Sequence, residues 1–273
     1  MDIWGIECVS IGSSISPYCL PCWFVPRRLG RSRPARIRIG PCLSSGLSPE
    51  YGVMRTSPVF PTKPLSDVPV ATVRYFHTPV AGEAKTRLVP RLGAAGAARL
   101  QERLIDSALE TAIALSDSRV TLWVAGDARH PFIAGCAQRV GVRVRIQQGC
   151  DLGARMLNAF ADTLAPDRCD RCLLIGTDCP ALTTADLAAA AQALAANDAV
   201  VQPAEDGGYV LIGLRAPHAP LFEGIEWGGP KVMQATRERM ARLGLRWCER
   251  PPLPDLDTPE DYERALAAGW LAD

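Results

Sequence analysis

Hydrophobic and polar positions alternate in strand-like and helix-like patterns from Val70 onward. Short apolar or strictly alternating runs predict strands, whereas apolar residues three or four positions apart predict helices. The region 94–116, for example, repeats Leu100, Leu104, Ala108, Ala112 and Leu115 along one helical face. The pattern predicts strands at 70–76, 120–125, 142–146, 171–176, 198–202 and 208–214, and helices at 94–116, 151–164, 183–195 and 230–243.

The last predicted helix has clear boundary signals. Thr258 is the expected N-cap, Pro259 suits the first helical position, and Asp261 can complete a capping box. Gly269 is expected to end the helix.

Alternation of buried strands with helices predicts an α/β fold, with a mostly parallel central sheet covered by helices on both faces. Ligands of such sheets bind beyond the carboxyl ends of the strands. We therefore expect one domain over 70–273, with its chemistry in the loops that follow the strands.

Residues 1–69 have a different composition, rich in Pro, Ser, Gly and Arg, without helical or strand periodicity. We expect a disordered leader or a mis-assigned start, with Met54 as the internal candidate; an organelle transit peptide is the alternative.

The chain has 10 Cys in no regular framework, which favours reduced thiols. Zinc at Cys19-x-x-Cys22 or Cys169-x-x-Cys172 is the alternative, although neither pair has a nearby partner pair.

Charge is nearly balanced, with 30 basic and 29 acidic residues. This balance argues against a dedicated binder of nucleic acid or of an anionic membrane, which would show a basic excess. The sequence contains no run of 18 or more uncharged apolar residues, so it predicts no transmembrane helix. We expect a cytoplasmic protein whose partners are small molecules; the sequence does not predict the oligomeric state.

Two strand-end loops could bind phosphate. In the first, Gly82 permits a close backbone bend, and Lys85 and Arg87 place two cations just before a helix. The spacing is not that of a Walker loop, and a solvated charged loop is the alternative. In the second, Gly149 and Gly153 permit close approach, and Arg155 could reach a phosphate or form an ordinary surface pair.

Carboxylates follow two later strands. Asp178 ends a buried strand, where an isolated carboxylate is costly unless it is paired or binds metal, and Thr177 could orient it. Glu205 and Asp206 precede Gly207 and Gly208, a turn that could lie against a substrate or be a plain hairpin. A second carboxylate, Asp257, would complete a metal site if it meets Asp178; otherwise it serves the following helix.

The motifs P-x-x-G-x-x-K-T-R-L, G-x-D-L-G-x-R-M, G-T-D-C-P-A-L, P-A-x-D-G-G-Y-x-L-I-G-L and D-x-D-T-P-E-D occur in this order, with Trp227 before the last. Their series resembles the DUF2064 family, over about Val70 to Gly269. The resemblance implies a GT-A fold of the nucleotide-diphospho-sugar transferase superfamily and a nucleotide-linked substrate. Asp151, in the second motif, would join the nucleotide site, and Tyr209 and Trp227 would join the substrate site.

More distant resemblances concern the mechanism. The A-K-T-R-L segment is similar to the phosphate loop of 2-phospholactate guanylyltransferases, which implies phosphate ligands at Lys85 and Arg87. The D-T-P-E-D segment is similar to the end of the CMP-sugar synthetases, which implies Mg²⁺ or Mn²⁺ on Asp178 and Asp257. The family usually has Lys or Arg shortly after the first strand, where this chain has His77.

Two reactions fit these residues. Nucleotidyl transfer from an NTP is slightly favoured, because the cationic K-T-R-L loop suits a triphosphate. Glycosyl transfer from an NDP-sugar to a small acceptor is the alternative. A protein that binds a nucleotide without catalysis is a third possibility, against which the intact Asp178 and Asp257 argue.

Overall fold

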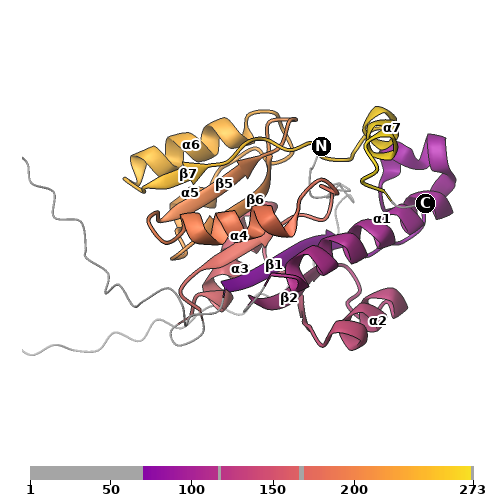
Figure 1. Cartoon of the computed structure of the whole chain (residues 1–273), viewed down its shortest axis with the longest axis horizontal. Helices are drawn as coiled ribbons and strands as arrows, with labels where there is room; N and C mark the ends of the chain where they lie inside the picture. Colours follow the sequence, from indigo (N-terminus) through magenta and orange to yellow (C-terminus); the bar gives the residue numbers. More distant parts are fainter. Residues whose placement is uncertain (1–69, 116–117, 166–168, 272–273) are drawn as a thin grey trace, which may run out of the picture. The chain divides into compact units, whose positions relative to one another are not determined.

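The structure is a computed structural model that describes residues 70–115, 118–165 and 169–271, and for 70–77 the backbone alone. The prediction for residues 1–69 lies outside the described residues, as does the side chain of His77. The described residues belong to one compact unit (Figure 1).

One sheet forms the centre of this unit, with the strand order β3-β2-β1-β4-β6-β5-β7. Strands β3, β2, β1 and β4 run parallel, as do β5 and β7, whereas β6 is antiparallel to both of its neighbours. The expected mostly parallel sheet is confirmed. The strands are β1 (Val70–His77), β2 (Ser118–Ala125), β3 (Arg143–Ile146), β4 (Cys172–Ile175), β5 (Ala199–Pro203), β6 (Tyr209–Leu214) and β7 (Trp247–Glu249).

Helices cover both faces of the sheet, as expected. In β4, Leu174 packs in a cluster with Phe160 of α3, whereas its neighbour Leu173 packs in a cluster with Leu187 of α4. Figure 1 shows these helices around the strands. The helices are α1 (Val89–Ile113), α2 (Pro131–Val140), α3 (Leu152–Thr163), α4 (Thr184–Ala193), α5 (Ala219–Phe222), α6 (Val232–Arg242) and α7 (Pro259–Ala267), preceded by the 3-10 turn η1 (Thr86–Leu88).

The predicted start of α7 is confirmed. Thr258 is the N-cap, its hydroxyl accepts the N–H of Asp261, and the Asp261 carboxylate accepts the Thr258 N–H. Gly269, with a φ of 71°, follows the helix. The described residues of α7 then pack on η1 and α1 through a cluster that contains Leu88, Leu104 and Ala265.

Some elements were not predicted. The sequence pattern predicted no element at α2, α5 or β7, which are short and bury few residues. β5 and β6 form an antiparallel pair, so the turn at 204–208 is a hairpin turn, the alternative considered above.

Among the described residues, no helix combines the length and the apolar character that a membrane span requires. The described cysteines are free thiols at 136, 150, 169, 172, 179 and 248.

Candidate functional site

Residues far apart in the sequence meet at the carboxyl end of β4. The backbone N–H of Leu256 donates to the carbonyl of Asp178 over 2.8 Å, which joins the segment before α7 to this strand end. Leu253 forms a bridge with Ala204, so the same segment also lies beside the β5–β6 turn. This docking brings Asp257 to Asp178.

Lys85 links the two carboxylates. Its Nζ lies 2.9 Å from Oδ1 of Asp178 and 2.9 Å from Oδ1 of Asp257, and it donates to the carbonyl of Leu256 over 2.6 Å. The Lys85 side chain is only 6% exposed. Its backbone adopts a φ of 48°, a left-handed conformation that costs energy in a residue with a β-carbon. The tight loop therefore aims a buried ammonium at the buried carboxylate of Asp178 and the partly buried carboxylate of Asp257.

Burial and charge act in opposite directions on these groups. Burial by itself lowers the pKa of Lys85, but the charges of Asp178 and Asp257 outweigh it and hold the pKa above its ordinary value. Burial raises the pKa of Asp178, and the charge of Asp257 adds to this, while Lys85 and the Thr177 hydroxyl oppose it. The lysine is thus a fixed cation, and its charge favours the ionised form of Asp178.

The two aspartates fit a divalent cation. Both carboxylate oxygens contact one ammonium, so they lie within twice 2.9 Å of each other, and a single ion could contact both. Among the described residues, no three His, Cys, Asp or Glu side chains form a complete metal-binding group. Two carboxylates with the remaining positions open suit Mg²⁺, which keeps waters and takes phosphate oxygens.

Arg87 lies at the edge of this cluster. Its side chain is 42% exposed, and Nη1 is 3.9 Å from Oδ2 of Asp257. In the same loop Gly82 has a φ of 86°, and a β-carbon there would meet nothing within 4 Å. Of the two cations that the sequence analysis expected to bind phosphate, Arg87 is open to a ligand, whereas Lys85 is engaged by the carboxylates.

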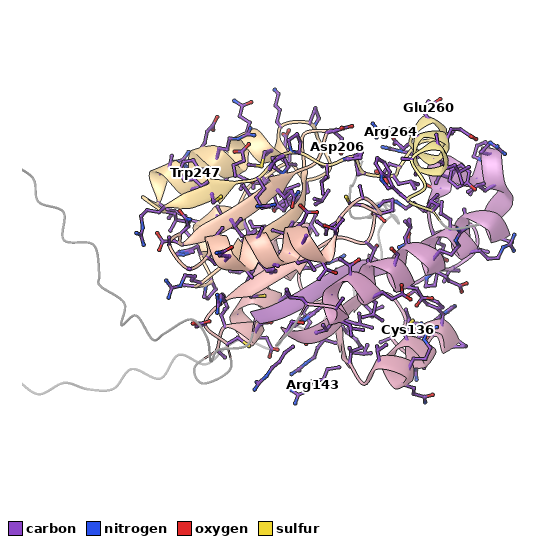
Figure 2. All side chains as sticks on the ribbon, viewed as in Figure 1. Cys136, Arg143, Asp206, Trp247, Glu260 and Arg264 are labelled. Carbon is purple, nitrogen blue, oxygen red and sulfur yellow. The ribbon has the colours of Figure 1, made fainter. Side chains whose placement is uncertain are left out.

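The β5–β6 turn contributes further acidic groups. Asp206 accepts the N–H of Gly208 over 2.9 Å; partial desolvation raises its pKa against this bond, and Asp257 adds to the rise. Glu205 pairs with Arg264 of α7 over 2.7 Å (Figure 2 labels Asp206 and Arg264). Gly207 packs against the carbonyl of Pro230, where a β-carbon would collide with it.

Asp255 is a buried carboxylate near this site for which the sequence predicted no role. It is 7% exposed, and burial with the charges of Asp206 and Asp257 raises its pKa to about 7. Its position two residues before Asp257 in the D-x-D-T-P-E-D motif was the available signal.

The loop after β3 is held by its own contacts. Asp151 caps α3 by accepting the N–H of Ala154 over 2.7 Å, and Arg155 Nε donates to the carbonyl of Gly149 over 3.2 Å. A β-carbon on Gly149 would lie 2.7 Å from the backbone nitrogen of Arg155. The glycine expected to admit a ligand therefore also has a packing role.

Gly153 and the two aromatic residues form a packed unit beside this loop. A β-carbon on Gly153 would lie 2.8 Å from the ring of Trp227 and 2.5 Å from the Phe222 carbonyl. Tyr209 is 1% exposed, meets Trp227 edge to face at 6.5 Å between ring centroids, and directs its hydroxyl to Met156. The Tyr209 side chain belongs to the core, and the partly buried Trp227 packs against that core.

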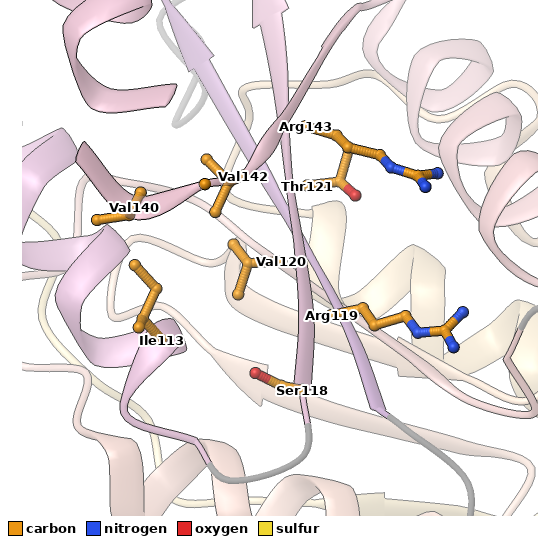
Figure 3. A pocket seen from close by; sticks show the side chains of 9 residues that line it. Ile113, Ser118, Arg119, Val120, Thr121, Val140, Val142 and Arg143 are labelled. Atoms are coloured by element: carbon orange, nitrogen blue, oxygen red, sulfur yellow. The ribbon is translucent and has the colours of Figure 1, made fainter. Parts of the chain in front are cut away.

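A cavity of about 530 Å³ lies elsewhere, at the amino ends of β2 and β3. Figure 3 shows Arg119 and Arg143 extending to one side, with Val120, Val140 and Val142 on the other. The strand ends there are opposite to the loops that carry Lys85 and Asp178. This cavity is separate from the candidate site, whose paired carboxylates lie at the other end of the strands.

Comparisons with known proteins agree with this fold. The family model described as an uncharacterized protein conserved in bacteria, DUF2064, matches residues 108–229. A crystal structure from Desulfovibrio desulfuricans G20, provisionally described as a nucleotide-diphospho-sugar transferase, is 31% identical with a TM-score of 0.66. That match covers 72% of this chain and 85% of that chain.

A second structure supports the fold alone. The 4-diphosphocytidyl-2C-methyl-D-erythritol synthase of Anaerococcus prevotii DSM 20548 is 10% identical with a TM-score of 0.52, and the match covers 75% of this chain and 97% of that chain. No curated protein matches the chain significantly.

Proposed function

Because this chain belongs to the DUF2064 family, and is by family and fold a transferase, we propose that it transfers a group from a nucleotide-activated donor with the help of a divalent cation. One observation carries the proposal. Asp178 and Asp257, 79 positions apart, converge on one cation at the carboxyl end of a strand, where α/β proteins bind ligands.

The protein's part in the reaction is positioning and charge. Asp178 and Asp257 would hold Mg²⁺ or Mn²⁺, which when bound neutralises charge on the donor's phosphates. With a divalent cation on the carboxylates, Lys85 would keep its bond to the Leu256 carbonyl, and its ammonium would be free to donate to a phosphate oxygen. Arg87 would reach the same phosphates from the exposed side of the loop.

Other residues would surround the donor and acceptor. Gly82, with open space around it, would let the backbone approach the phosphates. The loop after β3 would meet the nucleotide through Asp151 and Arg155, on a backbone shaped by Gly149 and Gly153. Asp206 would accept a hydroxyl of the small acceptor, with Gly207 and Gly208 shaping that turn, while Tyr209 and Trp227 would support it from the core.

We favour nucleotidyl transfer from an NTP, since two cations in one loop suit the leaving pyrophosphate. Glycosyl transfer from an NDP-sugar is the second candidate, favoured by the description of the Desulfovibrio relative as a nucleotide-diphospho-sugar transferase.

Thermal shifts with each NTP and each NDP-sugar, with and without Mg²⁺, test the proposal. A ligand at 100 times its Kd stabilises the folded state by about 2.7 kcal/mol. A metal-dependent shift with NTPs alone supports nucleotidyl transfer, and one with NDP-sugars alone supports glycosyl transfer. Binding without turnover of any tested acceptor supports a nucleotide-binding role without catalysis. No metal-dependent shift with any nucleotide would refute the proposal.

A further inference from the structure

One buried side chain of α1 is polar, although the other buried side chains described in this helix are apolar. Gln101 is 5% exposed, and every other buried residue described in this helix is alanine, leucine or isoleucine. Burying an amide costs free energy unless its hydrogen bonds are made, and an aliphatic residue would pack here without that cost. The glutamine therefore calls for an explanation in its contacts.

Those contacts lead to the candidate metal site. Gln101 Nε2 donates to Oγ1 of Thr177 over 3.2 Å, and the Thr177 hydroxyl donates to Oδ1 of Asp178 over 3.3 Å. The same Oδ1 is the atom that Lys85 contacts at 2.9 Å. Gln101 and Thr177 are both buried, so water does not substitute readily for either bond.

The chemistry of the groups fixes which group donates in each of these two hydrogen bonds. An ionised carboxylate only accepts hydrogen bonds, so the single proton of the Thr177 hydroxyl must point to Asp178. The hydroxyl oxygen can then only accept, and the Gln101 amide supplies the N–H. With this N–H in place the hydroxyl is held toward Asp178, and the carboxylate keeps one orientation.

We propose that Gln101 is a positioning residue, which through the Thr177 hydroxyl orients the Asp178 carboxylate to receive the divalent cation. The inference rests on the proposed function, because it requires a cation at Asp178. Outer hydrogen bonds of this kind typically contribute 10–100-fold to metal affinity.

The test measures the affinity of the full chain for Mn²⁺ alone, by electron paramagnetic resonance of the free ion, together with the melting temperature without metal. Gln101→Met keeps the side-chain size but removes the amide, and should weaken Mn²⁺ binding by about tenfold. The matched control is Gln202→Met, because Gln202 is also buried (1% exposed) but donates to the Pro251 carbonyl. This control should bind Mn²⁺ as the wild type does.

Variants of Thr177 separate positioning from general destabilisation. Thr177→Val should weaken Mn²⁺ binding by a similar factor, whereas Thr177→Ser keeps the hydroxyl and should bind Mn²⁺ as the wild type does. Adding Gln101→Met to Thr177→Val should weaken Mn²⁺ binding no further. Wild-type affinity in Gln101→Met or in Thr177→Val, or a second full loss in the double variant, overturns the positioning role. A wild-type chain that does not bind Mn²⁺ contradicts the proposed function itself, and this result appears before any variant is made.

Discussion

At the scale of single residues, the Lys85 ammonium holds together the buried carboxylate of Asp178 and the partly buried carboxylate of Asp257. Lys85→Met removes the charge, and without metal we expect a loss of about 3 kcal/mol or more in the free energy of unfolding, because the buried Asp178 carboxylate loses its ion pair and Asp257 keeps only the long contact with Arg87. Mn²⁺ should bind this variant more tightly than the wild type, since no ammonium competes. Chemical denaturation with and without Mn²⁺ measures both effects.

Arg87→Met is the matched control for that experiment. Its side chain is 42% exposed and 3.9 Å from Asp257, so the loss should be below about 1 kcal/mol. Equal destabilisation of the two variants would show that the ion pairs of Lys85 stabilise the folded state no more than the exposed contact of Arg87 does.

The pH dependence of stability should reveal Asp255. Its pKa is raised to about 7, so the folded state binds its proton more tightly than the unfolded chain, whose pKa is about 4. The contribution of this group to the free energy of unfolding is therefore fully present below about pH 4 and is lost as the pH rises through about 7. In EDTA, Asp255→Asn should be more stable than the wild type at pH 8, by on the order of 2 kcal/mol, with a smaller difference at pH 5. Unfolding curves at both pH values check this, and a difference that is independent of pH counts against it.

At the residue scale the sequence predicted which chemistry to look for but not how its parts meet. Asp178 and Asp257 could be singled out because one ends a buried strand and the other precedes a capped helix. Their convergence depends on the Leu256–Asp178 backbone bond, which no local pattern encodes. For the same reason Lys85 was expected on phosphate and not between the carboxylates.

At the scale of elements, α3 depends on a glycine at its start. A β-carbon on Gly153 would lie 2.5 Å from the Phe222 carbonyl and 2.8 Å from the Trp227 ring, so we expect Gly153→Ala to cost about 1–3 kcal/mol. Gly135→Ala in α2 is the control, because its β-carbon meets nothing within 4 Å, and it should stabilise by about 0.4–1 kcal/mol. Melting temperatures that do not move in opposite directions contradict this account of the packing.

Elements were predictable where local signals were strong. The Thr258–Asp261 capping box and the long stripe of α1 each depend on residues within a few positions, and the predicted helices exist. The four-residue α5 and the three-residue β7 have too few residues to show a period. The antiparallel direction of β6 follows from the tight turn at 204–208, which was read both as a hairpin and as a substrate loop.

At the scale of the whole molecule, the regular alternation of strand and helix patterns begins near Val70, and residues 1–69 show no such periodicity. We therefore expect a chain that starts at Met54, and so keeps β1, to melt within about 2 °C of the full chain. In a domain of this size 1 kcal/mol corresponds to about 2–4 °C. Differential scanning calorimetry of both chains makes the comparison, with Mn²⁺ affinity as a second readout. A drop of more than about 4 °C, or a weaker affinity, would mean that residues before Met54 contribute to the domain, and the boundary near Val70 would be wrong.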